Sequence, residues 1–135
     1  MGTHWQTIAL ESTKKIELLD ITDHVTRACQ SAGPDDGLAV VYCPHTTAGV
    51  TIQEAEPGLL HDLEQWLTRV VPSEGAYEHD RVDDNAASHL REVIAGASAV
   101  VPLQRGTLAL GTWQRILFVE LDGPRDREVH VGVIA

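Results

Sequence analysis

The sequence is poor in the residues that mark nucleic-acid-binding and membrane-spanning proteins. Lys and Arg number 10 against 20 acidic residues, so the formal net charge is −10, and no basic run is present that could follow a phosphate backbone. The longest nearly apolar stretch, residues 93–103, is interrupted by Gly96 and Pro102 and reaches about half of the roughly 20 residues that a spanning helix needs. We therefore expect neither nucleic acid nor a membrane among its partners.

Cysteine is also scarce, and no export signal is recognisable. The N-terminal residues do not form a basic head followed by an apolar run. In a chain of this kind, two thiols such as Cys29 and Cys43 are more often small buried side chains than a disulfide. The sequence predicts a cytoplasmic protein without a disulfide framework.

The composition is that of an ordinary globular protein. With 43% hydrophobic and 22% charged residues, 135 residues fit one compact domain with a single core. We expect one domain over residues 1–135.

Strand patterns outnumber helix patterns along the chain. Helices are expected at residues 22–30, 57–70 and about 85–95, the last one burying Leu90, Val93 and Ile94. The order of elements lacks strict strand-helix-strand alternation, so we predict a β-rich α+β fold, mainly antiparallel, with a hairpin joining the first two strands. Strands are expected at residues 5–10, 16–21, 37–43, 49–54, 98–104, 107–112, 115–121 and 128–134.

The common catalytic signatures are missing. The sequence contains no GxGxxG, Walker loop, GxSxG, HExxH or CxxC. Dinucleotide-binding, nucleoside-triphosphate-binding, serine-hydrolase and zinc-protease chemistry therefore have no local support.

Histidine is the informative excess, with seven residues in the chain. His79 and Asp80 lie in the polar loop of residues 73–84, and Asn85 and His89 are four apart on the following helix, so they share a face. Imidazoles with nearby carboxylates suit a divalent ion such as Zn²⁺, and they equally suit proton transfer near neutral pH. The alternatives are a solvated His79, a His89 packed in the core, and an Asp84 that only caps the helix.

Two consecutive stretches, residues 98–106 and 107–114, resemble the signature of the YjbQ family, often labelled secondary thiamine-phosphate synthase. Further matching stretches span His45 to Arg127, and the ordered set is specific although each piece alone is weak. They are residues 44–48, residues 77–80, Asp84-Asn85 with His89, and Glu120 with residues 122–125.

This resemblance implies a sandwich-like α+β domain that assembles as a homotrimer, with polar sites near the subunit boundaries. It implies candidate catalytic residues His45, Asp80, Asp84, Asn85 and His89, and candidate substrate-binding residues Thr46, Thr47, Trp113, Gln114 and Arg125. His45, His79 and His89 are the candidate ligands of a divalent ion, Zn²⁺ or Mg²⁺.

The activity that the resemblance implies is the joining of hydroxymethylpyrimidine diphosphate to a thiazole phosphate, with release of pyrophosphate. It is implied as a side activity, so the native substrate stays open, and other small anionic or phosphorylated molecules are candidates. Two other functions stay open: a hydrolase that uses a histidine-bound metal ion, and a trimeric ligand-binding module without catalysis. Trp113 either packs in the core or stacks on a heterocycle.

Overall fold

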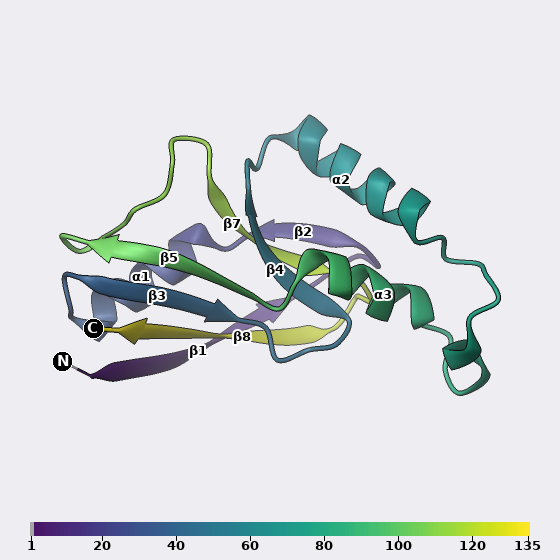
Figure 1. Cartoon of the computed structure of the whole chain (residues 1–135), viewed down its shortest axis with the longest axis horizontal. Helices are drawn as coiled ribbons and strands as arrows, with labels where there is room; N and C mark the ends of the chain where they lie inside the picture. Colours follow the sequence, from purple (N-terminus) through teal and green to yellow (C-terminus); the bar gives the residue numbers. More distant parts are fainter. Residues whose placement is uncertain (1) are drawn as a thin grey trace.

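Two antiparallel sheets form the framework of the chain, for which a computed structural model describes residues 2–135. Every neighbouring pair of strands is antiparallel (Figure 1). The first sheet has the order β1 (Thr3–Glu11), β8 (Asp126–Ile134), β3 (Gly37–Tyr42), β5 (Ser98–Gln104) and β6 (Thr107–Leu108). The second has the order β2 (Glu17–Asp20), β7 (Arg115–Glu120) and β4 (Ala48–Gln53).

Three α-helices and one short 3-10 helix complete the fold, which confirms the predicted β-rich α+β class. Helix α1 contacts β1, β7 and β8, and α3 lies against β4. Helix α2 contacts β2 and is drawn above it in Figure 1. None of the helices within residues 2–135 is long and apolar enough to cross a membrane. The helices are α1 (Thr22–Ala32), α2 (Pro57–Val70), η1 (Glu78–Arg81) and α3 (Ala86–Ala95).

Helix α2 begins and ends where the sequence predicts. Pro57 occupies the first turn, where its missing N–H is not needed. The Glu56 carboxylate accepts hydrogen bonds from the amides of Gly58, at 2.9 Å, and Leu59, at 2.7 Å. These bonds satisfy two of the amides that a helix leaves free at its start.

The predicted hairpin between the first two strands is wrong. Strand β1 pairs with β8, so that Thr3 lies opposite Ile134, and β2 pairs with β7, so that Glu17 lies opposite Glu120. The polar run between the two strands carries the chain from one sheet to the other. Strand alternation defines which face of a strand is buried, but it does not identify the partner strand.

The buried face of α3 also differs from the prediction. Leu90, Val93 and Ile94 are 45%, 76% and 42% exposed. The helix approaches β4 so closely that a side chain on Gly49 would meet the backbone of Gly96. Because the helix lies so close to the strand, its buried face carries mainly small side chains. The buried residues of α3 are Ala86, Ala87, Ser88 and Arg91.

The main core lies between the two sheets and α1. Cys29 and Cys43 belong to it as free, buried thiols, and burial raises the pKa of the Cys43 thiol to about 11. The other large core side chains come from the inward faces of the strands and α1, among them Ile21, Val25, Val41, Val50, Val101, Ile116, Phe118, Val129 and Val131.

A buried ion pair lies where the strands converge. The side chains of Glu120 and Arg127 are 0% and 4% exposed, and their closest N–O distance is 2.6 Å. The Ser12 hydroxyl donates to Glu120 at 2.6 Å, and Arg127 donates to both the hydroxyl and the carbonyl of Thr47. Burial acts to raise the pKa of Glu120, but the hydrogen bonds from Arg127 and Ser12 outweigh it and hold that pKa below its usual value. The pair therefore joins the ends of β1 and β7 to the starts of β4 and β8.

We expect Glu120→Gln to lower the free energy of unfolding by about 3–5 kcal/mol, because it leaves the Arg127 guanidinium buried without its counter-charge. Urea denaturation measures this loss. The matched control is Arg115→Met, which breaks the half-exposed pair with Asp20 and is expected to cost less than about 1 kcal/mol. Equal losses of unfolding free energy in the two variants would contradict the conclusion that the buried Glu120–Arg127 pair matters more to stability than an exposed pair.

Candidate functional site

A cluster of charged and polar side chains surrounds Asp122, just beyond the end of β7. The Asp122 carboxylate accepts hydrogen bonds from the Lys15 ammonium, from the Asn85 amide at 3.0 Å and from the Arg125 guanidinium at 3.3 Å. The carboxylate is nearly buried, whereas the side chains of Lys15 and Arg125 are 58% and 50% exposed. Two cations thus reach solvent around one fixed carboxylate.

Asn85 connects this carboxylate to two histidines. Because its amide nitrogen donates to Asp122, its oxygen faces His79 and accepts from Nε2 of that ring at 3.1 Å. The His79 ring meets the His89 ring edge to face, with 4.8 Å between the ring centres. A hollow of about 540 Å³ adjoins the two rings and is lined by Ala76, Tyr77, Glu78, His79, Ala86, His89 and Leu90.

Local contacts hold the polar loop against α3. The buried Arg91 donates to the carbonyl of Val71, at 2.7 and 3.0 Å, and to the hydroxyl of Ser73. Further along the loop, the Asp80 carboxylate accepts from the amide of Ala86 at the start of α3. These bonds fix both ends of the segment that carries His79.

The charges of the cluster favour an anion. Burial acts to raise the pKa of Asp122, but the hydrogen bonds from Lys15 and Asn85 and the charges of Lys15 and Arg125 lower it below its usual value. Asp122 is therefore ionised at neutral pH and balances one of the two cations. The remaining positive charge can bind anionic oxygens. Asn85 links this cluster to His79 and His89, whose imidazoles can exchange protons and whose hollow is also lined by Glu78.

His45 makes its hydrogen bonds with Glu128, and within residues 2–135 none joins it to this cluster, although the family resemblance implies one metal site for His45, His79 and His89. Its Nε2 accepts from the amide of Glu128 at 3.0 Å, and the carbonyl of the same residue lies 3.1 Å away. Burial, together with the Arg127 charge, lowers the pKa of His45. Within residues 2–135, no three His, Cys, Asp or Glu side chains are grouped as metal ligands. The predicted set of three histidine ligands is therefore not assembled within residues 2–135 of one chain.

Several other candidate residues have structural contacts. Thr47 is buried and accepts from Arg127, and Gln114 closes a turn by accepting from the amide of Gly111 at 2.8 Å. Asp80 rather than Asp84 or Asn85 caps α3 through its side chain. Thr46 and Asp84 are exposed and take no side-chain hydrogen bond within the described part of the chain.

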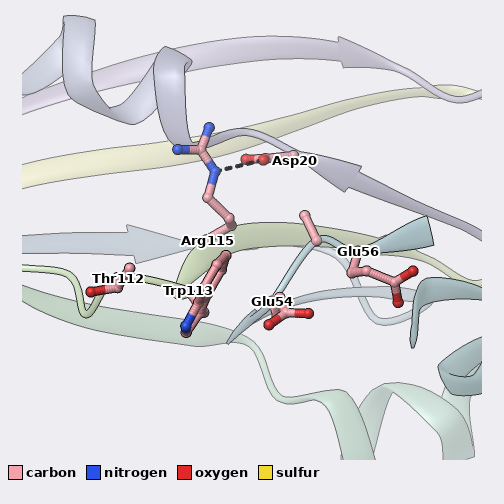
Figure 2. Close-up of a pocket in the computed structure, with 7 residues that line it drawn as sticks. Asp20, Glu54, Glu56, Thr112, Trp113 and Arg115 are labelled. Carbon is pink, nitrogen blue, oxygen red and sulfur yellow. Dashed lines mark hydrogen bonds and ion pairs between the residues drawn. The ribbon is translucent and has the colours of Figure 1, made fainter. Parts of the chain in front are cut away.

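Trp113 is 71% exposed, which excludes the core-packing alternative for this residue. It lies just before β7, at the opposite end of that strand from Asp122, and lines a separate hollow (Figure 2). The candidate substrate-binding residues Trp113 and Arg125 therefore do not share one site within a chain.

Lys15 and Asp122 are the members of the cluster that sequence reasoning missed. Lys15 stands in a short polar run, and Asp122 begins an Asp-Gly-Pro turn, so each has an ordinary local explanation. The one available signal was that Asp122 falls in a stretch matching the family pattern.

Comparisons with known proteins agree with this fold. The family model described as UPF0047 protein YjbQ-like matches residues 6–135. The chain belongs to the YjbQ (UPF0047) family. A UPF0047 protein of Archaeoglobus fulgidus is 50% identical over 127 residues, covering 94% of this chain and 98% of the relative. The UPF0047 protein YugU of Bacillus subtilis is 42% identical over 131 residues, covering 96% and 98%.

Two solved structures extend the likeness to three dimensions. A hypothetical protein from Aeropyrum pernix K1 has a TM-score of 0.95 at 41% identity, with 98% of each chain covered. A YbjQ-like protein of unknown function from Sulfolobus solfataricus P2 also has a TM-score of 0.95, at 34% identity, covering 98% of this chain and 96% of that one. The architecture is that of the YjbQ family.

The burial of His45 near the Arg127 charge predicts a pH dependence of stability. Because folding lowers the pKa of His45 below its ordinary value of 6.5, the unfolded chain binds the proton more readily. Stability from this group is present above pH 6.5 and is lost as the pH falls through the lowered pKa. We expect His45→Gln to flatten this part of the stability profile in urea titrations, and the exposed His24→Gln to leave it unchanged. A His45→Gln profile that keeps the wild-type slope would contradict this role.

Proposed function

We propose that this chain is a cytoplasmic enzyme that acts on small phosphorylated substrates, with an activity like that implied by its family resemblance. The reaction joins hydroxymethylpyrimidine diphosphate to a thiazole phosphate and releases pyrophosphate. The observation that carries the proposal is the continuous set of contacts from the exposed cations Lys15 and Arg125 through Asp122 and Asn85 to His79.

The cations have a direct use in this reaction. Negative charge develops on the departing pyrophosphate oxygens, and fixed cations beside them stabilise the transition state. Lys15 and Arg125 are held by one carboxylate and still reach solvent, so both can meet a diphosphate without a rearrangement of the fold.

The histidines supply proton transfer in the same proposal. The thiazole nitrogen attacks through its lone pair and loses no proton, so the transfer that the reaction can use is protonation of the departing pyrophosphate. His79 donates through Nε2 to Asn85, so Nδ1 is the ring atom left to carry that proton. His89 packs against that ring and lines the adjoining hollow. Asn85 and Asp122 act as positioning residues, because they orient the ring and the cations.

Turnover of the two substrates, followed by pyrophosphate release, tests the proposal. We expect wild-type protein to release pyrophosphate only when both substrates are present, and His79→Ala to lower kcat/KM by about 100-fold, because proton transfer contributes at least that factor. The matched control is His61→Ala, on the exposed side of α2. No release by the wild type, or equal rates in both variants, would contradict the proposal.

We also propose that the active form is a homotrimer whose subunits meet through α3. Leu90, Val93 and Ile94 form an exposed apolar face on the helix that carries His89. A face of this kind is unfavourable in water and is typical of a contact between subunits. Contact there would place the His79 and His89 pair at a subunit boundary.

Sedimentation equilibrium tests this assembly. We expect a mass three times the 14.7 kDa of the chain, and dissociation by Val93→Asp, because a carboxylate would be buried in the contact. Val100→Asp is the control, since it places the same charge on the exposed face of the first sheet. A monomeric wild type, or dissociation by Val100→Asp alone, would contradict the proposed contact.

A further inference from the structure

A second hollow lies at the start of β7, at the opposite end of that strand from Asp122. Strands β2 and β4, the two neighbours of β7, both end near this point. Gln53, the last residue of β4, pairs with Arg115, and Asp20, the last residue of β2, pairs with Leu117. The hollow has a volume of about 460 Å³ and is open to solvent (Figure 2). Its lining consists of Asp20, Glu54, Ala55, Glu56, Thr112, Trp113 and Arg115.

The indole of Trp113 forms an exposed aromatic wall of this hollow. The turn that carries it is closed by two hydrogen bonds, from the amide of Gln114 to the carbonyl of Gly111 at 3.1 Å and from the amide of Gly111 to the Gln114 side chain at 2.8 Å. The turn thus presents Trp113 outward, with 71% of the residue exposed. Large aromatic surface held in water by a closed turn is available to stack on a flat ligand.

The charge at this hollow is negative. Its lining has three carboxylates and one guanidinium, and the guanidinium of Arg115 is bonded to Asp20 at 2.7 Å and to Asp23 at 3.5 Å. The Glu56 carboxylate is held by the first amides of α2, which lower its pKa. Within residues 2–135, the Glu54 carboxylate takes part in no hydrogen bond or ion pair. Glu54 and Trp113 line the same hollow.

We propose that this hollow binds a small, flat organic cation, which stacks on Trp113 and places its positive charge toward Glu54. The ring quadrupole of an indole attracts a cation over its face, and a carboxylate adds Coulomb attraction that a neutral ring lacks. An anion would face the excess of negative charge. This site shares no lining residue with the histidine hollow, so the inference stands independently of the proposed reaction.

N-methylpyridinium chloride is the probe, and toluene is its uncharged counterpart of the same shape. Binding is followed through the indole N–H resonances in nitrogen-15 correlation spectra, with Trp113→Leu assigning the signal. Trp5 and Trp66 are internal controls, because they are 55% and 42% exposed but lie outside the hollow. We expect a saturable shift of the Trp113 signal alone with N-methylpyridinium and none with toluene, at matched ionic strength. Equal shifts of all three indoles, a response to toluene, or a Trp113 signal unchanged because another copy covers it would overturn the proposal.

Two variants assign the interaction to its groups. Removing the indole in Trp113→Leu should weaken binding by about two- to fivefold, the value of a cation over an exposed ring. That loss is measured through the backbone amide of Thr112. Glu54→Gln should also weaken binding, whereas Glu74→Gln, an equal charge change outside the hollow, should not. Equal affinity in Glu54→Gln and Glu74→Gln would overturn the role of Glu54.

Discussion

The buried ion pair of Glu120 and Arg127 connects the two sheets, because Glu120 ends β7 in one sheet and Arg127 lies at the start of β8 in the other. One carboxylate accepts from Arg127, from the Ser12 hydroxyl and from the amides of Leu121 and Asp122. Desolvation offsets much of the attraction within such a pair, so its main consequence is geometric: breaking it leaves an uncompensated charge in the interior. Asp122 lies two residues further along, and its amide donates to the Glu120 carboxylate at 3.1 Å, so Glu120 fixes where Asp122 lies.

Strand β7 separates two surfaces of opposite character. Beyond its last residue, Asp122 gathers the cations Lys15 and Arg125. Before its first residue, Trp113 faces a hollow with an excess of carboxylates. The two surfaces lie at opposite ends of β7, whose residues between them are buried. In a chain with a net charge of −10, the Asp122 carboxylate holds the two cations Lys15 and Arg125 side by side.

The elements of the fold were predictable where local chemistry decides them, and their partners were not. Pro57 and the apolar stripe after it define α2, whereas nothing near β1 indicates that it pairs with β8. In the site, the spacing of Asn85 and His89 predicts a shared helix face, and the loop brings His79 to it. Lys15 and Asp122 are 107 residues apart, and only the assembled sheets bring them together.

The dependence of the site on the buried pair is tested most directly by amide hydrogen exchange and side-chain amide resonances in Arg127→Met. Arg127 donates to Glu120, and the Asp122 amide donates to Glu120 in turn, so the effect must pass through that carboxylate. The account predicts faster exchange of the Asp122 amide and a shift of the Asn85 side-chain amide signals in the folded variant. A folded Arg127→Met protein with wild-type exchange at Asp122 and unchanged Asn85 signals would contradict it.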